Sequence, residues 1–180
     1  MENMELDKIA EMVEELKRQG TAGRGGEVAD LSGDIMELLA LGGTMKAVFD
    51  FDDKDMEVIY FSAHGYYENG KYEKAAPLFQ FLCVYDHLNP KWFMGLGATL
   101  QMMRNYEEAV KSYGYATILD MENPAPQYNA GYCLALTGKK DEARLALEAV
   151  VMLADDRGGM DEYRRKAENL LSTLNEGEHA

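Results

Sequence analysis

A step of 34 residues recurs along the sequence and constrains the fold more than any other feature. Ala75, Ala109 and Ala143 are separated by that step each time. Further columns keep the same register: Ala63, Gly97 and Gly131; Tyr66, Leu100 and Leu134; Phe79, Tyr113 and Leu147; Leu82, Ala116 and Val150. A chance array of amphipathic helices would keep a period of 3.6 residues, but it would not hold so many columns in a common 34-residue register.

Each column has a physical role in a pair of helices. The small residues let two helices approach closely, and the large apolar residues fill the space between neighbouring pairs. Asn89-Pro90 and Asn123-Pro124 open the first helix of the second and third copies, because Asn is a good N-cap and Pro is tolerated at the first helical position. Gly70 and Gly138 supply the turn inside a pair, where a positive φ is needed, although Arg104 stands in the middle copy.

This period and residue order are typical of the tetratricopeptide repeat. We therefore predict an all-α tetratricopeptide-repeat superhelix of three helix pairs, with an N-terminal helical extension and a C-terminal capping helix. The copies span residues 56–89, 90–123 and 124–157. Pro77 falls inside the second helix of the first copy, where it should remove a backbone hydrogen bond or kink the helix.

The flanking segments are predicted to be helical as well. Residues 160–175 form an amphipathic helix that can cap the repeats, within a C-terminal unit of residues 158–180. Residues 34–55 contain a short apolar helix, Asp34–Leu41, and an acidic connecting loop, and residues 1–33 form a partly helical or flexible extension. We expect a homodimer, because Ile35, Leu38 and Leu39 need cover.

The charge of the chain excludes several classes of partner. Thirty-two acidic residues against eighteen basic ones give a formal net charge of −14. Nucleic acids and anionic membrane surfaces require a basic surface, so neither is expected as a partner. The sequence has no apolar run of the roughly 18–20 residues that a membrane span needs, and its acidic start is unlike a secretory signal, so we expect a cytoplasmic protein.

No catalytic constellation is present, so we predict neither an enzyme nor a bound cofactor or metal. His64, His87 and His179 are scattered, and no phosphate-binding or nucleophile motif occurs. Cys83 and Cys133 lie in apolar helical stretches without metal-type spacing, which predicts buried free thiols. Acidic pairs such as those at 52–53 and 155–156 lie in loops or at helix starts, where they favour the helix N-terminus.

The concave face of the superhelix is the candidate binding site, because the first helix of each pair lines it. Tyr60, His64 and Tyr67 lie at positions i, i+4 and i+7 and share one face. The equivalent residues in the next copies are Met94, Ala98 and Gln101, then Tyr128 and Tyr132. Such aromatic and Met side chains suit apolar peptide side chains, although they could instead only fill the packing between repeats. Among the residues at the places that clamp a C-terminal carboxylate in some repeat proteins, only Lys91 and Asn129 would serve, so an internal apolar segment is the expected ligand.

From about Gly42 to Leu174 the sequence resembles the class II chaperones of bacterial type III secretion systems, the group of SycD, LcrH, IpgC and SicA. The matching stretches are GGTMKAV at 42–48, YYENGKYEKAAPLFQFLCVYDHLNP at 66–90, MGLGA at 94–98 and GYCLALTGKKDEA at 131–143. The FLCVYD run at 81–86 is the most specific, because tetratricopeptide repeats in general do not carry it.

The resemblance implies a non-enzymatic chaperone of the bacterial cytoplasm. Such proteins keep hydrophobic translocators soluble and unassembled before export, and they hold an extended segment near the client's N-terminus in the concave groove. The groove aromatics of the family fall on Tyr60, His64 and Tyr67, where His64 replaces the usual Tyr or Phe. The family commonly dimerises through the helix before the repeats, here Asp34–Leu41. The alternative is a repeat scaffold or co-regulator that binds a transcription activator or another secretion component.

Overall fold

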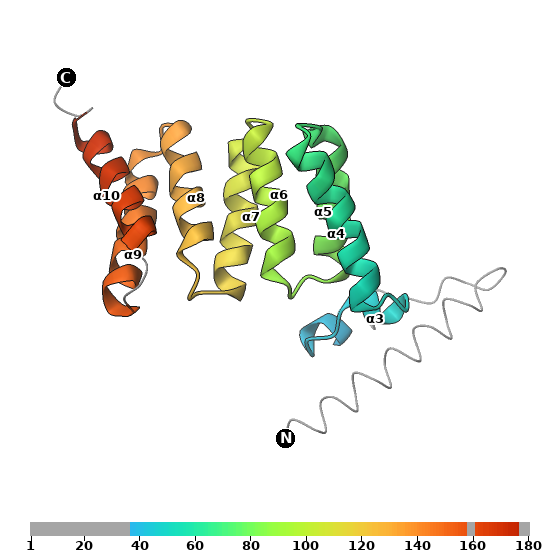
Figure 1. The fold of residues 1–180 in the computed structure, drawn as a ribbon. Helices are drawn as coiled ribbons and strands as arrows, with labels where there is room; N and C mark the ends of the chain where they lie inside the picture. The colour runs from blue at the N-terminus through green and yellow to red at the C-terminus, as the bar shows by residue number, and fades with distance from the viewer. Residues whose placement is uncertain (1–36, 158–160, 177–180) are drawn as a thin grey trace.

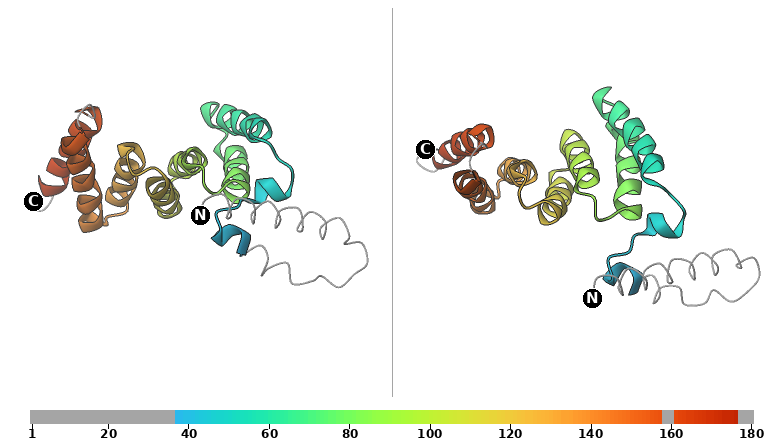
Figure 2. Two further views of the ribbon diagram at one scale, coloured as in Figure 1. Left: turned by 90° about the horizontal axis from the view of Figure 1, so that it is seen from below. Right: turned by 60° about the horizontal axis from the view of Figure 1, so that its bottom comes forward.

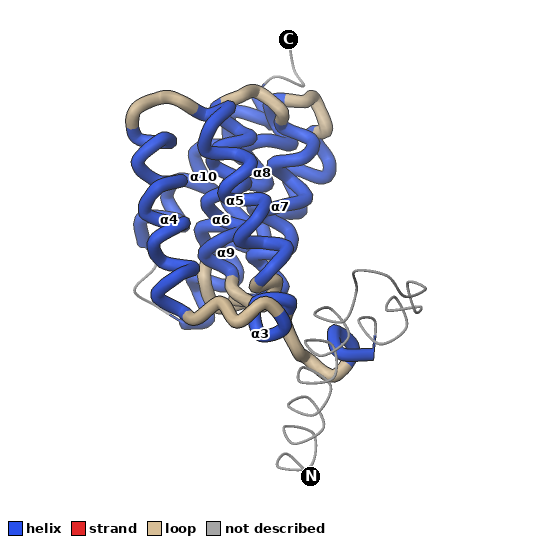
Figure 3. Tube along the Cα trace, turned by 90° about the vertical axis from the view of Figure 1, so that its right-hand side faces the viewer, coloured by secondary structure: helices blue, strands red, loops and turns tan. Residues whose placement is uncertain are grey.

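The computed structural model describes residues 37–157 and 161–176, and all the regular structure in those ranges is helical (Figure 3). The helices are α3 (Met45–Val48), α4 (Asp53–Glu68), α5 (Tyr72–Tyr85), α6 (Pro90–Met102), α7 (Tyr106–Leu119), α8 (Pro124–Leu136), α9 (Lys140–Arg157) and α10 (Asp161–Glu176). None of these helices combines the length and the apolar character needed to cross a membrane. The predicted N-terminal extension, residues 1–33, lies outside the described residues.

The helices form pairs that follow one another in a single row from α4 to α10 (Figures 1 and 2). Helices α4 and α5, α6 and α7, and α8 and α9 pack as neighbours, and α10 packs on both α9 and α8. The predicted all-α tetratricopeptide superhelix with a C-terminal capping helix is therefore confirmed. The first helices of the pairs, α4, α6 and α8, share one side of the row.

The N-termini of the first helices are capped as the sequence predicts. Asp52 and Asp55 form a reciprocal capping box, in which the Asp55 N–H donates to the Asp52 carboxylate at 2.8 Å. This hydrogen bond lowers the pKa of Asp52. The side chains of Asn89 and Asn123 accept from the backbone N–H two residues later, at 3.1 and 3.0 Å. A Pro follows each Asn at the first helical position, so the start of each helix is fixed locally.

The turn inside each pair has the same left-handed geometry in all three copies. Gly70 and Gly138 have φ of 68° and 77°, and Arg104 has φ of 60° in the middle copy. In each turn the N–H of the next residue bonds a carbonyl five positions earlier, as from Asn105 to Leu100 at 2.9 Å. Arg104 therefore differs from Gly70 and Gly138 in residue type but adopts the same backbone conformation.

The core columns pack as predicted, with one exception. Ala75, Ala109 and Ala143 are completely buried, and a Cβ added to Gly97 would lie 2.7 Å from the Tyr113 ring. The prediction that Tyr66 belongs to the core is wrong, because Tyr66 is 37% exposed whereas the other two residues of its column are buried. Tyr66 lies in the first pair, and among the described helices no pair precedes α4 to cover this side of it.

Two further expectations have clear outcomes. Helix α5 continues through Pro77, whose side chain is exposed, so the proline does not end the helix. Cys83 and Cys133 are buried free thiols, as predicted. Burial raises the pKa of Cys83 to about 12 and that of Cys133 to about 11, which keeps both protonated at neutral pH.

Candidate functional site

A pocket of about 220 Å³ opens on the side of the row formed by the first helices. It lies between the first two helix pairs, with residues from α4, α5 and α6. Its lining residues are Tyr60, His64, Tyr67, Phe79, Lys91, Met94, Gly95 and Ala98. Five of the residues predicted from the sequence to face the groove are thus brought together around one hollow.

The α4 side of the pocket is an aromatic stripe. The ring centroids of Tyr60 and His64 are 5.6 Å apart, and those of His64 and Tyr67 are 6.3 Å apart. Tyr67 also meets Tyr72 of α5 edge-on at 5.6 Å, and burial raises the pKa of the Tyr67 phenol. His64 lies 3.6 Å from the Glu68 carboxylate through its Nδ1. The stripe offers ring faces and tyrosine hydroxyls to the pocket.

Phe79 supplies part of the pocket wall from the second helix of the first pair. A Cβ at Gly95 would collide with the Phe79 ring, so glycine at this position lets the ring reach the pocket. The 34-residue register predicts Phe79 only as a core residue. The detectable signal was Gly95, the first glycine of the MGLGA stretch, two residues before the repeat glycine Gly97.

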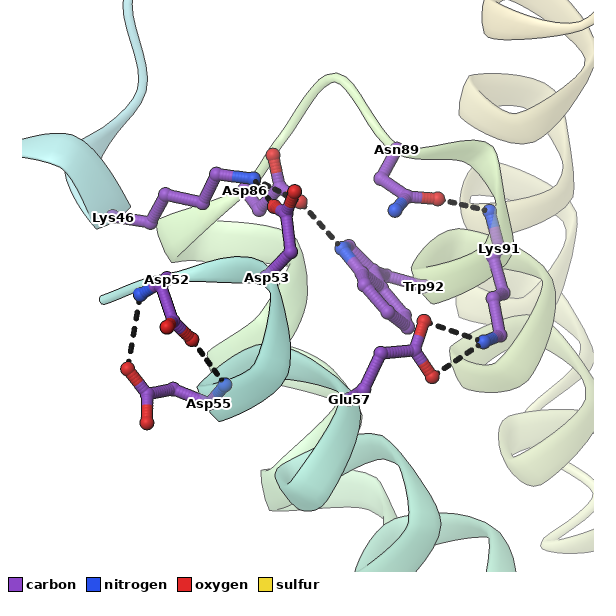
Figure 4. Close-up of polar contacts among 9 residues, drawn as sticks. All are labelled: Lys46, Asp52, Asp53, Asp55, Glu57, Asp86, Asn89, Lys91 and Trp92. Atoms are coloured by element: carbon purple, nitrogen blue, oxygen red, sulfur yellow. Dashed lines mark hydrogen bonds and ion pairs between the residues drawn. The ribbon is translucent and has the colours of Figure 1, made fainter.

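Lys91 places an ammonium group at the edge of this pocket, beside its aromatic and apolar lining. Its Nζ lies 3.7 Å from the centroid of the Tyr60 ring and 5.1 Å from that of Trp92. It also bonds both carboxylate oxygens of Glu57, at 2.8 and 2.9 Å (Figure 4). The ammonium is therefore held by charge on one side and by a ring face on the other.

Below the pocket, a buried polar contact joins three segments of the chain. The Asp86 carboxylate is almost fully buried and accepts a hydrogen bond from the Trp92 indole N–H at 3.0 Å. The same carboxylate pairs with Lys46 of α3 at 3.3 Å, and Lys46 also reaches Asp53 at 2.7 Å (Figure 4). Burial alone would lower the pKa of Lys46, but its two carboxylate partners outweigh that effect and raise it.

The aromatic residues of the FLCVYD run strengthen the same junction. Phe81 stacks on Tyr85 at 4.2 Å, and Phe51 meets both rings edge-on at 5.6 and 5.5 Å. Phe49 meets Tyr85 at 5.3 Å. The rings of Phe81 and Tyr85, together with the Asp86 carboxylate, therefore attach the segment before the repeats to the first helix pair.

The remaining predicted groove residues lie outside the pocket. Gln101 is half-buried one turn beyond Ala98 on α6, and its side-chain oxygen accepts from the Tyr113 hydroxyl at 2.8 Å. Tyr128 of α8 meets Tyr163 of α10 edge-on at 5.9 Å, and Tyr132 is 37% exposed.

The residues predicted to form a dimer contact lie before α3. Ile35 lies outside the described residues. Leu38 is completely buried and packs on Gly43, where a Cβ would collide with it, whereas Leu39 is half-buried. Residues 37–40 are helical and Gly42 has φ of 84°, which agrees with the predicted stop of that helix at the glycine pair.

Comparison with known proteins agrees with this architecture. A tetratricopeptide-repeat family model matches residues 59–89 and 92–123. The Low calcium response locus protein H of Yersinia pestis is 34% identical over 133 residues, which cover 74% of this chain and 79% of that protein. The chaperone protein SicA of Salmonella dublin is 31% identical over 144 residues, covering 80% and 85% of the two chains. This chain belongs to the LcrH/SicA family of type III secretion chaperones.

Solved structures of this family share the fold of the chain. The type III secretion translocator chaperone SycD of Yersinia enterocolitica, in a structure described as an alternative dimer, matches with a TM-score of 0.66 and 30% identity over 72% of this chain and 98% of that one. SycD in complex with a peptide of the translocator YopD matches with a TM-score of 0.66 and 31% identity, covering 71% and 97% of the two chains.

Proposed function

We propose that this protein is a cytoplasmic, non-enzymatic chaperone that holds an extended segment of a type III secretion translocator in the groove along α4, α6 and α8. The observation that carries the proposal is the aromatic pocket bounded by Tyr60, His64, Tyr67 and Phe79. Its volume of about 220 Å³ suits one or two small apolar side chains and not a folded domain. Membership of the chaperone family and the YopD peptide bound to SycD support this reading.

The chemistry of the groove indicates an internal segment of the client. The pocket presents ring faces and a single ammonium, Lys91, which Glu57 already neutralises. A terminal carboxylate would need several free cations, whereas an apolar side chain gains by leaving water for the aromatic pocket. Because the segment stays extended, the remainder of the client can be kept soluble and unassembled by a chaperone with a net charge of −14.

The test is co-expression with a translocator from the same bacterium, followed by purification through a tag on the translocator. The double variant Tyr60→Ala/Tyr67→Ala should lose co-purification, because it removes two of the rings that line the pocket. The matched control is Tyr115→Ala, which removes an exposed tyrosine of α7 that does not line the pocket. Retention of the translocator by the double variant, or failure of the unmodified chain to retain any translocator, would contradict the proposal.

We also propose that the chain assembles as a homodimer through the segment around Ile35, Leu38 and Leu39. This assigns assembly to residues 34–55 and client binding to the repeats at 56–157. Leu38 is already buried in the chain, so the informative variant is Leu39→Glu at the half-buried position. Light scattering at micromolar concentration should give a dimer mass for the unmodified chain and a monomer mass for the variant. A monomer mass for both would refute this assembly.

A further inference from the structure

The centre of the groove contains a hydrogen-bonding group that the aromatic pocket does not use. Gln101 follows Met94 and Ala98 on the same face of α6, so the lining of the groove continues from the pocket to its carboxamide. Its side-chain oxygen accepts from the Tyr113 hydroxyl of α7 at 2.8 Å and lies 3.6 Å from the Cys133 sulfur of α8. One amide therefore joins three helices from two successive pairs.

The partners of Gln101 hold its amide in one orientation. Tyr113 is buried, and the absence of a side chain at Gly97 is what allows its ring to pack against α6. Burial raises the pKa of Tyr113 and that of Cys133, so both groups keep their protons and act as donors. Both hydrogen bonds go to the carbonyl oxygen of the amide, so the NH2 group points the other way.

The NH2 group of Gln101 has no hydrogen-bond partner within residues 37–157 and 161–176. Gln101 is half-buried, and helical spacing places it on the face of α6 that carries the pocket residues Met94 and Ala98. An extended peptide in the groove would bring main-chain carbonyls against ring faces, and a carbonyl that loses water without finding a donor is costly. The groove therefore needs a neutral donor in its centre, and Gln101 has two N–H bonds available.

We propose that Gln101 donates a hydrogen bond to one main-chain carbonyl of the bound segment and so fixes its register in the groove, with Tyr113 as the positioning residue. The proposal rests on the proposed function, because it concerns the same groove. Side chains of the segment would enter the pocket on α4. Because the hydrogen bond to Gln101 fixes the register of the segment, it would determine which side chains reach that pocket. The donor is uncharged, so it suits a main-chain amide better than a carboxylate.

The experiment uses the full chain and synthetic peptides that cover the N-terminal part of the translocator that co-purifies with it. Affinity is measured by isothermal titration for Gln101→Leu, Tyr113→Phe and the double variant Gln101→Leu/Tyr113→Phe. Gln101→Leu should weaken the tightest peptide by about tenfold, the typical worth of one hydrogen bond. Tyr113→Phe should weaken it less, because the amide remains but loses its anchor. Gln80→Leu, an exposed glutamine on α5, is the matched control and should leave affinity unchanged.

The double variant separates binding from folding. Gln101→Leu alone leaves the buried Tyr113 hydroxyl without its acceptor and should lower the melting midpoint, whereas removing both partners should restore it. Affinity should stay low in the double variant even though the midpoint recovers. Recovery of affinity together with the midpoint would show that Gln101 acts only through the fold, and would overturn the proposal.

Peptides with one amide bond replaced by an ester locate the carbonyl, because an ester oxygen is a weaker acceptor. One ester position should weaken binding to the unmodified chain by several-fold and have no effect on binding to Gln101→Leu. Equal ester effects in both proteins, or unchanged affinity in Gln101→Leu, would overturn the inference while leaving the proposed function intact. If no peptide binds the unmodified chain, the proposed function fails and the inference fails with it.

Discussion

The first and third helix pairs follow the same repeat pattern, yet they present different surfaces to the groove. In the first pair, Tyr60, His64 and Tyr67 of α4 surround an open pocket. In the third pair, Tyr128 of α8 lies against Tyr163 of the capping helix α10, at a ring distance of 5.9 Å. The position of a residue in the repeat thus decides which side of a helix it faces, and the neighbouring helix decides whether that side is open.

The neighbours differ for reasons that can be traced to single residues. Beside α4, the absence of a side chain at Gly95 of α6 leaves room for the Phe79 ring. The ring forms part of the pocket wall, and the pocket stays open. Beside α8, the apolar face of α10 covers the end of the row. Ala167 and Leu174 of α10 are buried in a hydrophobic cluster, and Tyr128 packs against that cluster. An aromatic residue at the same place in the pattern therefore lines an open pocket at one end and packs against a neighbouring helix at the other.

Trp92→Ala gives the largest expected effect, because it removes the support beneath the pocket. The indole is buried and bonds Asp86, so its loss should create a cavity and leave a buried carboxylate short of one donor. We expect a decrease of about 3–5 kcal/mol in the free energy of unfolding. Urea denaturation followed by circular dichroism measures it.

The control for Trp92→Ala is Met152→Ala, which truncates an exposed side chain of α9 and should change stability by less than about 0.5 kcal/mol. A loss of less than about 1 kcal/mol in Trp92→Ala would mean that the first pair does not depend on this contact. The junction with α3 through Asp86 and Lys46 would then be of little energetic importance.

The sequence alone could predict the faces of the helices but not what covers them. The 34-residue register placed Phe79, Tyr113 and Leu147 in the core, because an internal repeat repeats its packing. It failed at Tyr66, which lies at the end of the row, where the repeating neighbour is missing.

The site was predictable to a similar extent. Helical spacing grouped Tyr60, His64 and Tyr67 because it is a local property. It could not show that Phe79 reaches the pocket past Gly95, nor that Lys91 lies over the Tyr60 ring. Those contacts depend on the distance between α5 and α6 and on a side-chain conformation, neither of which has a period in the sequence.

A double-mutant cycle on Tyr128 and Tyr163 sharpens the contrast at the other end of the row. If the two rings pack as a structural pair, the variants Tyr128→Leu and Tyr163→Leu should each destabilise the chain, and the coupling free energy should be about 1 kcal/mol. Chemical denaturation of the four proteins gives this value. The matching cycle on Tyr60 and Tyr115, two rings in different helix pairs that are not in contact, should show coupling near zero. Coupling near zero for Tyr128 and Tyr163 as well would mean that Tyr128 is free to serve as groove lining, like Tyr60.

The smallest effect is expected at the turn between α6 and α7, where the middle pair can be compared with the two outer ones. Arg104 adopts φ of 60°, the conformation that Gly70 and Gly138 adopt in the equivalent turns. A side chain at positive φ is strained, so Arg104→Gly should raise the free energy of unfolding by about 0.5–1 kcal/mol, after allowing for the greater freedom of glycine in the unfolded chain. The reverse change, Gly138→Ala, should lower it by about 1 kcal/mol, because nothing crowds the position and only the backbone strain is added. Urea midpoints with unchanged slopes measure both effects. If the free energy of unfolding hardly changes in either variant, the strain is relieved elsewhere in the turn. A gain for Arg104→Gly together with a loss for Gly138→Ala would show that the three turns share one backbone conformation and differ only in how well each residue fits it.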